Sequence, residues 1–179
     1  MLKIKIDSIE LYDEKNNLFT FSKETEIILE HSLVSLSKWE SRYLRPFLTK
    51  GNKTPRETLD YIRDMTITQN VDDGLYNLIS KGNIEKILDY IDSPMTATVL
   101  PKQTGSINRE TVTSELIYYW MVAFNIPFEC QKWHLNRLLT LINICSIKNQ
   151  PKKKMSAKEL RDRNRALNET RKQQLNTNG

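Results

Sequence analysis

Part of the first thirty residues alternates apolar and polar positions with the period of two that is typical of half-buried β-strands. The run Leu2–Ile6 does so most regularly, with an apolar residue at every second position. Segments 9–12 and 18–21 flank a polar turn sequence and predict a β-hairpin, and residues 27–29 add a further candidate strand. Because a sheet of two to four strands cannot bury both of its faces, we expect this sheet to pack on helices.

From about Leu36 onward the apolar residues recur with helical spacing. A short helix is predicted from Leu36 to the region of Pro46. The sequence Thr54-Pro-Arg-Glu57 predicts the start of the next helix, because it combines a capping threonine, a proline at the first helical position and a glutamate three residues after the cap. Apolar spacings of three and four over 84–91 predict another helix, with Asn83 as its cap.

Residues 93–107 contain two prolines and a glycine and therefore predict a loop. A short extended piece is predicted within it at 96–100. Asn108 then offers a side-chain cap for the helix that follows the loop.

Two long segments with broad apolar stripes, 108–125 and 129–149, predict the main helices of the core. Pro127 separates them, since continuing a helix through a proline costs about 3 kcal/mol. A break this short predicts an antiparallel helical hairpin at the centre of the structure. Trp120 and Leu139 are expected to be buried on its facing sides.

These elements predict an α+β fold that is mainly helical. A small N-terminal sheet, over about 2–30, packs on a helical core, over about 36–149, and residues 1–150 form one domain. Residues 151–179 form a basic C-terminal tail, which we expect to be partly helical or disordered.

The formal net charge of +5 is located in the tail. Nine basic and three acidic residues follow Pro151, so the tail carries +6 and the body −1. Only five glycines occur among 179 residues, which argues against Gly-rich phosphate loops. The longest apolar stretches are shorter than the ~18–20 residues that span a bilayer, and no apolar signal segment opens the chain, so we expect a cytoplasmic protein without a membrane span.

Two cysteines and two histidines are the residues that suggest chemistry. Cys130 and His134 lie four positions apart on a predicted helix, which places two metal ligands on one face, but His31 and Cys145 do not complete the paired spacings of a zinc site. A cysteine nucleophile also needs an oriented base and an oxyanion site, and no motif supplies them. No nucleotide-binding, nucleophile-elbow or kinase motif occurs. We therefore expect buried thiols, no metal, no cofactor and no catalytic residue.

Large amphipathic side chains are numerous for one small domain: Trp39, Tyr43, Tyr118, Tyr119, Trp120, Phe128 and Trp133. Core packing explains most of them. The two long helices nevertheless carry more apolar surface than a small sheet and short helices cover, so we expect part of it to bind a protein partner or a second copy. The candidate partner-binding residues are three aromatic residues and six basic residues of the tail: Trp39, Tyr43, Trp133, Lys152, Lys153, Lys154, Arg161, Arg163 and Arg165.

The tail has three interpretations that its sequence leaves open. It aids solubility, docks on an acidic protein surface, or contacts nucleic acid through clustered lysine and arginine. Three acids interrupt the basic run and no aromatic residue accompanies it to stack on bases, which weakens the nucleic-acid interpretation. Residues 157–172 are good helix formers, but chiefly Leu160 and Leu167 offer apolar anchors, so a helix there is marginal by itself.

Five stretches between about residues 30 and 170 carry a family resemblance, and they are Ser35–Glu40, Tyr61–Thr66, Met95–Thr98, Glu115–Met121 and Asn125–Ile142, followed by the Pro-Lys-Lys-Lys start of the tail. They resemble small proteins of tailed bacteriophages that are often described as tail assembly chaperones. The resemblance implies a protein of the host cytoplasm that binds the long, helical tape measure protein and keeps it soluble while tail subunits polymerise.

The expected function is therefore that of a phage tail morphogenesis factor without catalytic activity. A helix-in-groove interface suits this function, because it needs exposed apolar surface and no chemistry. Two alternatives stay open: a minor structural protein retained in the virion tail, and a nucleic-acid-binding accessory protein that acts through the basic tail.

Overall fold

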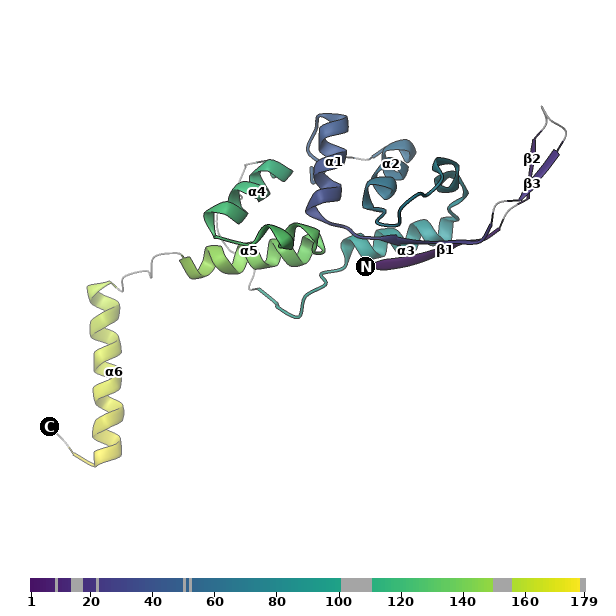
Figure 1. The fold of residues 1–179 in the computed structure, drawn as a ribbon. Helices are drawn as coiled ribbons and strands as arrows, with labels where there is room; N and C mark the ends of the chain where they lie inside the picture. The colour runs from purple at the N-terminus through teal and green to yellow at the C-terminus, as the bar shows by residue number, and fades with distance from the viewer. Residues whose placement is uncertain are drawn as a thin grey trace. The chain divides into compact units, whose positions relative to one another are not determined.

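The computed structural model describes residues 1–8, 10–13, 18–21, 23–49, 51, 53–100, 111–149 and 156–177. The chain divides into two compact units, Met1–Ser146 and Ile147–Gly179. The first unit is mainly helical, with a small antiparallel N-terminal sheet packed on helices, which confirms the predicted fold class (Figure 1). Across the described residues, every helix is too short or too polar to cross a membrane.

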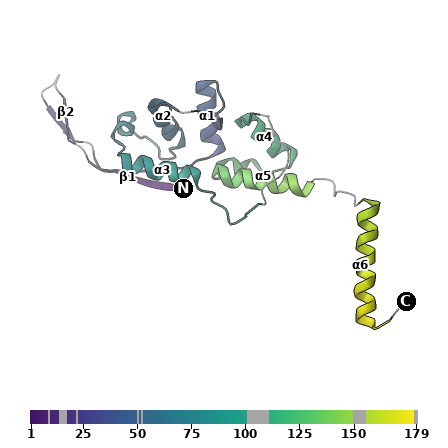
Figure 2. The ribbon, with the colours of Figure 1, turned by 180° about the vertical axis from the view of Figure 1, so that it is seen from behind.

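The N-terminal sheet pairs β1 (Leu2–Ile6) with β4 (Thr25–Leu29) in antiparallel register, with Ile4 opposite Ile27. Ile4 and Ile6 of β1 are buried and Leu2 partly so, as the period of two predicted, and Ile27 and Leu29 of β4 are buried as well. α3 (Lys81–Asp92) lies along β1, and both views of the ribbon show this contact (Figure 2).

The predicted hairpin also forms, as a separate two-stranded sheet of β2 (Glu10–Asp13) and β3 (Leu18–Phe21). Most of its predicted turn, residues 14–17, lies outside the described residues. The candidate strand at 27–29 pairs with β1 rather than with the hairpin, because this pairing places the apolar faces of β1 and β4 together on the helices.

α1 (Leu33–Tyr43) is the central helix of the first unit. It begins three residues before the predicted start at Leu36, because Ser32 caps it in a capping box. Its inner face, which includes Leu36 and Trp39, is fully buried. α2 (Pro55–Met65) and α4 (Ser114–Ala123) pack on it from opposite sides, and Figures 1 and 2 both show α1 between them.

The local signals for α2 are confirmed. Thr54 caps the helix, Pro55 opens it, and the Glu57 side chain accepts the Thr54 N–H at 2.7 Å to complete the capping box. A 3₁₀ helix, η1 (Asp73–Leu78), follows it.

The predicted cap of α3 is wrong. Ser80 caps the helix, and Asn83 lies inside it, where its amide donates a hydrogen bond to the Lys5 carbonyl oxygen at 2.9 Å. The Asn83 side chain, which the local spacing predicted as the helix cap, is instead used in a contact with β1, a strand distant in sequence. The extended piece predicted at 96–100 is also wrong, since these residues form no strand.

The predicted hairpin of two long helices is replaced by three shorter elements: α4, the 3₁₀ helix η2 (Phe128–Lys132) and α5 (Leu135–Asn149). The predicted break before Pro127 is confirmed. The predicted cap Asn108 lies outside the described residues, and Thr113 caps α4.

The second predicted helix is interrupted at Trp133 and His134 by tertiary contacts. His134 forms an isolated antiparallel bridge with Ser32, and the Leu135 N–H donates to the His31 carbonyl oxygen at 2.7 Å, so α5 starts only there. The main packing of α4 is against α1 rather than α5. The central helical hairpin was therefore a wrong prediction, and α1 occupies the centre instead.

The core positions of α4 and α5 are shifted from the predicted ones for the same reason. Trp120 and Leu139 are only partly buried, whereas Ile117, Met121 and Leu138 are fully buried. Once α4 packs on α1, the face that carries Ile117 and Met121 turns inward, and Trp120 moves to its edge.

Glu40 ties three segments together from the inner face of α1. One carboxylate oxygen accepts the Phe47 N–H at 2.8 Å, and the other accepts the N–H of Ser114, at the start of α4, at 2.7 Å. The side chain is almost fully buried. A carboxylate at a helix N-terminus is favourable electrostatically, and both backbone donors need a partner because they are buried.

The second unit contains α6 (Ala157–Leu175), which covers the stretch of predicted helix formers and runs slightly beyond it. Ser156 and Glu159 form a capping box, a signal present in the sequence and not used in the prediction. The described side chains of α6 are exposed along its whole length, including Leu160 and Leu167.

Replacing Glu40 by glutamine should lower the free energy of unfolding by about 1–3 kcal/mol, because the amide keeps one acceptor oxygen and leaves one buried N–H unpaired. Urea unfolding measures the change. Glu85→Gln, at an exposed position of α3, is the control and should be nearly neutral. Equal stability of the two variants would contradict the anchoring role of Glu40.

Neighbouring leucines on α5 provide a matched test of the core. Leu138→Ala should cost about 2–5 kcal/mol of stability, because it opens a cavity at a fully buried position. Leu139→Ala should cost clearly less, because its side chain is partly solvated in the folded state. A larger decrease in melting temperature for Leu139→Ala than for Leu138→Ala would contradict this packing and favour the predicted helical hairpin.

Candidate functional site

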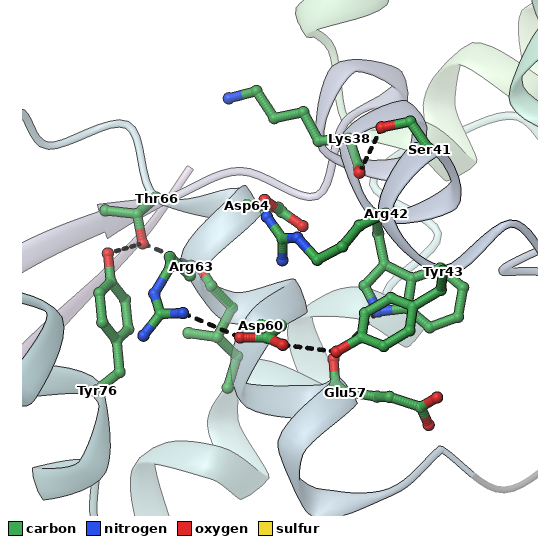
Figure 3. A network of polar contacts seen from close by, with 12 residues as sticks. Lys38, Ser41, Arg42, Tyr43, Glu57, Asp60, Arg63, Asp64, Thr66 and Tyr76 are labelled. Atoms are coloured by element: carbon green, nitrogen blue, oxygen red, sulfur yellow. Dashed lines mark hydrogen bonds and ion pairs between the residues drawn. The ribbon is translucent and has the colours of Figure 1, made fainter.

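A polar network joins α1 to α2 along one side of their interface (Figure 3). Arg42 donates to the Asp64 carboxylate at 2.8 Å, and the Tyr43 hydroxyl donates to Asp60 at 2.5 Å. Arg63 donates to the other oxygen of Asp60 at 2.9 Å within α2, and the bond from Tyr43 makes this carboxylate the link to α1. The network holds the two helices in one relative rotation.

Two of the candidate partner-binding aromatic residues form contacts between α1 and α2 instead. Trp39 is only 1% exposed, and its indole N–H donates to the Glu57 carbonyl oxygen at 3.1 Å. The hydrogen bond of Tyr43 to Asp60 raises the pKa of its hydroxyl group. Trp39 was therefore wrongly assigned to a partner surface, because its size is used to fill the core, and the Tyr43 hydroxyl serves the α1–α2 joint.

Trp133 lies in the extended link between η2 and α5 and is half-buried. The guanidinium of Arg137 lies over its ring, 4.3 Å from the centroid, which is the geometry of a cation–π contact. Arg137 was not among the predicted residues, although its spacing of four from Trp133 was visible in the sequence.

The basic candidates of the tail are only partly within the described residues. Lys152, Lys153 and Lys154 lie outside them. Arg161 and Arg165 share one face of α6 with Lys172, and together they line one shallow hollow of the helix surface. Arg163 is exposed on a different face, so the helix does not gather all three predicted arginines.

The described residues leave an apolar strip uncovered on α4. Tyr119 and Val122 are 65% and 59% exposed, and they follow Glu115 at spacings of four and seven, so the three share one helix face. Leu44, at the end of α1, lines the same surface hollow as Glu115 and extends the strip. We call these four residues, Leu44, Glu115, Tyr119 and Val122, the α4 strip.

Leu44 combines two unfavourable features. Its φ angle of 51° lies in the left-handed region, where a side chain with a Cβ atom is strained and glycine or asparagine is usual. Its side chain is also 88% exposed. The Leu44 N–H donates the last bond of the helix to the Glu40 carbonyl oxygen at 2.8 Å, and the left-handed turn at Leu44 then ends the helix, but this geometry does not require a leucine.

Comparison with protein-family models, curated proteins and solved structures finds no match to this chain. Interpretation of the sites therefore depends on their own chemistry.

Cys130 and His134 do not share a helix, contrary to the expected spacing. Cys130 lies in η2, and burial raises the pKa of its thiol, which favours the protonated form. His134 precedes α5, and both of its ring nitrogens are used: Nε2 donates to the Tyr90 carbonyl oxygen at 2.9 Å, and Nδ1 accepts the Asn136 N–H at 3.3 Å. Within the described ranges, no group of three or more His, Cys, Asp or Glu residues is arranged to hold a metal ion.

His31 and His134 form a buried pair of neutral imidazoles. Their ring centroids are 5.1 Å apart, and Nδ1 of His31 is hydrogen-bonded to the Tyr61 hydroxyl at 2.6 Å. Burial, with a smaller contribution from His134, lowers the pKa of His31 to about 3. Burial likewise lowers the pKa of His134. The pair is therefore uncharged at neutral pH and serves as packing.

The histidine pair should make the fold sensitive to mild acid. Below about pH 6.5 the unfolded chain binds a proton at each histidine, while His31 in the folded state does so only near pH 3, so stability is lost as the pH falls through this window. Each histidine adds a slope of up to about 1.4 kcal/mol per pH unit. Urea unfolding of wild-type protein and His31→Gln between pH 7 and 5 should show a flatter dependence for the variant. Identical slopes would contradict a buried, neutral His31.

Proposed function

We propose that this protein is an assembly factor that binds an amphipathic helix of a client protein on the α4 strip. The observation that carries the proposal is the apolar surface on both sides of α4. Ile117 and Met121 of its inner face are buried in the core, while Tyr119 and Val122 of its outer face meet solvent in the described part of the chain. A helix that is apolar all round is normally covered on both sides.

Packing against an amphipathic client helix fits the composition of this surface. A client helix presents apolar residues at spacings of three, four and seven, which match the rise of Tyr119 and Val122 along α4. Glu115 at the start of the strip favours a basic residue at the corresponding end of the client helix. The strain at Leu44 supports the same function, because strained backbone conformations cluster at functional sites.

The client that we propose is the tape measure protein of a tailed bacteriophage, and the support for it is the sequence resemblance to tail assembly chaperones. A long helical client exposes apolar stripes before it is packed inside the tail tube. A chaperone that covers one such stripe needs no catalytic residue, and the protein acts in the host cytoplasm during tail assembly.

A second candidate function is nucleic-acid binding by α6. The row formed by Arg161, Arg165 and Lys172 favours it, since one helix face presents several cations to a phosphate backbone. Glu169 lies beside this row and weakens its field. We therefore rank it below client binding.

The variant Leu44→Gly tests whether Leu44 of the α4 strip is needed for stability or for client binding. Glycine relieves the left-handed strain, so we expect a free energy of unfolding higher by about 1 kcal/mol. Loss of an apolar anchor should weaken client binding by about tenfold or more. Co-expression with the tape measure protein, followed by gel filtration and thermal melting, measures both quantities.

Val99→Gly is the control, because Val99 is 93% exposed and lies outside the strip. A tape measure protein that is equally soluble alone and forms no complex would refute the client. If Leu44→Gly leaves the complex unchanged, the proposal that the α4 strip binds the client would be refuted. Stoichiometric amounts in purified virions would favour the structural-protein alternative, and nucleic acid retained by full-length protein but lost on removal of residues 151–179 would favour the second candidate.

A further inference from the structure

A cavity of about 390 Å³ opens between the loop before α2 and the helices α2 and α3. This volume lies within the range of sites that hold small molecules, roughly 300–1,000 Å³. Its lining combines apolar walls, two buried polar groups and charged residues at the margin. None of these residues belongs to the α4 strip, so the cavity is a separate site.

Lys53 supplies a fixed cation to this cavity. Its ammonium donates to the Phe47 carbonyl oxygen at 3.0 Å and lies 3.9 Å from the centroid of the Phe47 ring. These two contacts hold a normally flexible side chain in one place. Burial, reinforced by the nearby Arg45 and opposed by Glu57, lowers the pKa of its ammonium group.

The Lys53 ammonium has no carboxylate within ion-pair distance among the described residues. None of the ion pairs among the described residues involves Lys53, and the adjacent Arg45 is already paired with Glu57. The nearby Glu57 offsets burial only in part, and a partly desolvated ammonium without an ion pair is unfavourable, so an anionic ligand would reduce this cost. The electrostatics of the cavity therefore favour an anion at the Lys53 end.

The remaining walls favour an apolar body. Leu48 and Leu88 lie in the lining and are still 39% and 47% exposed, and Ile91 continues the apolar wall inward. His31 also lines the cavity, with its Nδ1 hydrogen-bonded to the Tyr61 hydroxyl. Asp92 is part of the lining as well and disfavours a ligand with several negative charges.

We propose that this cavity binds a small organic monoanion with an apolar or aromatic body, whose anionic group pairs with Lys53 while its body lies against Leu88 and Ile91. The ligand class is that of aryl or branched alkyl carboxylates. Nucleotides are excluded by their charge and by the presence of Asp92. The site is independent of client binding by the α4 strip.

Isothermal titration of the full-length chain with 2-naphthoate tests this proposal. We expect saturable binding, and we expect the neutral isostere 2-naphthamide to bind about tenfold more weakly, because it cannot pair with the ammonium. Lys53→Met should lose a similar factor, whereas Lys53→Arg should retain most of the affinity. Lys86→Met, an exposed lysine of α3 outside the lining, should bind as the wild type does.

Leu88→Trp provides a second variant, because the larger side chain fills the cavity at an exposed position that the fold tolerates. It should abolish binding without lowering the melting temperature. Absence of naphthoate binding to the folded wild type at millimolar concentration would overturn the proposal. So would equal affinities for naphthoate and naphthamide, or undiminished binding by a folded Lys53→Met or Leu88→Trp variant.

Discussion

The carboxylate of Glu40 is the constraint on which the rest of the first unit depends. It accepts backbone N–H groups from residues seven and seventy-four positions away, and it does so from inside the core. One bond fixes the start of α4 against α1, and the other fixes the point at which the chain returns after α1. Since both donors are buried, neither has water as an alternative partner, and the three segments are held in one arrangement.

Both proposed sites follow from this arrangement. The bond to Ser114 brings the start of α4 to the end of α1, and there Leu44 and Glu115 come to share one surface. The bond to Phe47 sets its ring in the core and its carbonyl oxygen where Lys53 reaches it, which forms the margin of the cavity. A single buried side chain thus positions a candidate protein interface and a candidate ligand site on different parts of the molecule.

Some polar and aromatic side chains stabilise the fold, and others lie on the surface that we propose for a partner. Residue type alone does not decide which of these roles a side chain has. Trp39 is large and amphipathic, as an interface residue often is, but its N–H finds a backbone acceptor on α2 and the ring is buried. Asp60 accepts the Tyr43 hydroxyl of α1 and so connects two helices, while Arg63 pairs with it within α2. Tyr119 is of the same chemical kind as Tyr43, yet it finds no place in the core because α4 turns its other face to α1.

The sequence by itself determined the features that depend on neighbours a few residues apart. The alternation in Leu2–Ile6, the capping box at Thr54 and the break before Pro127 are local patterns, and each forms as predicted because its energy comes from backbone geometry and one-sided burial.

Only the tertiary structure decided which chain segments meet. The helix predicted from residue 129 is interrupted because His134 pairs with Ser32, about a hundred residues earlier in the chain, and Asn83 is drawn from a capping role to the Lys5 carbonyl. The choice of Ile117 over Trp120 as the core residue follows from the rotation of α4 on α1, which no periodicity in α4 specifies, since apolar residues occupy nearly every position of that helix. Neither the α4 strip nor the Lys53 cavity could be predicted from the sequence, because only long-range packing brings the residues of each together.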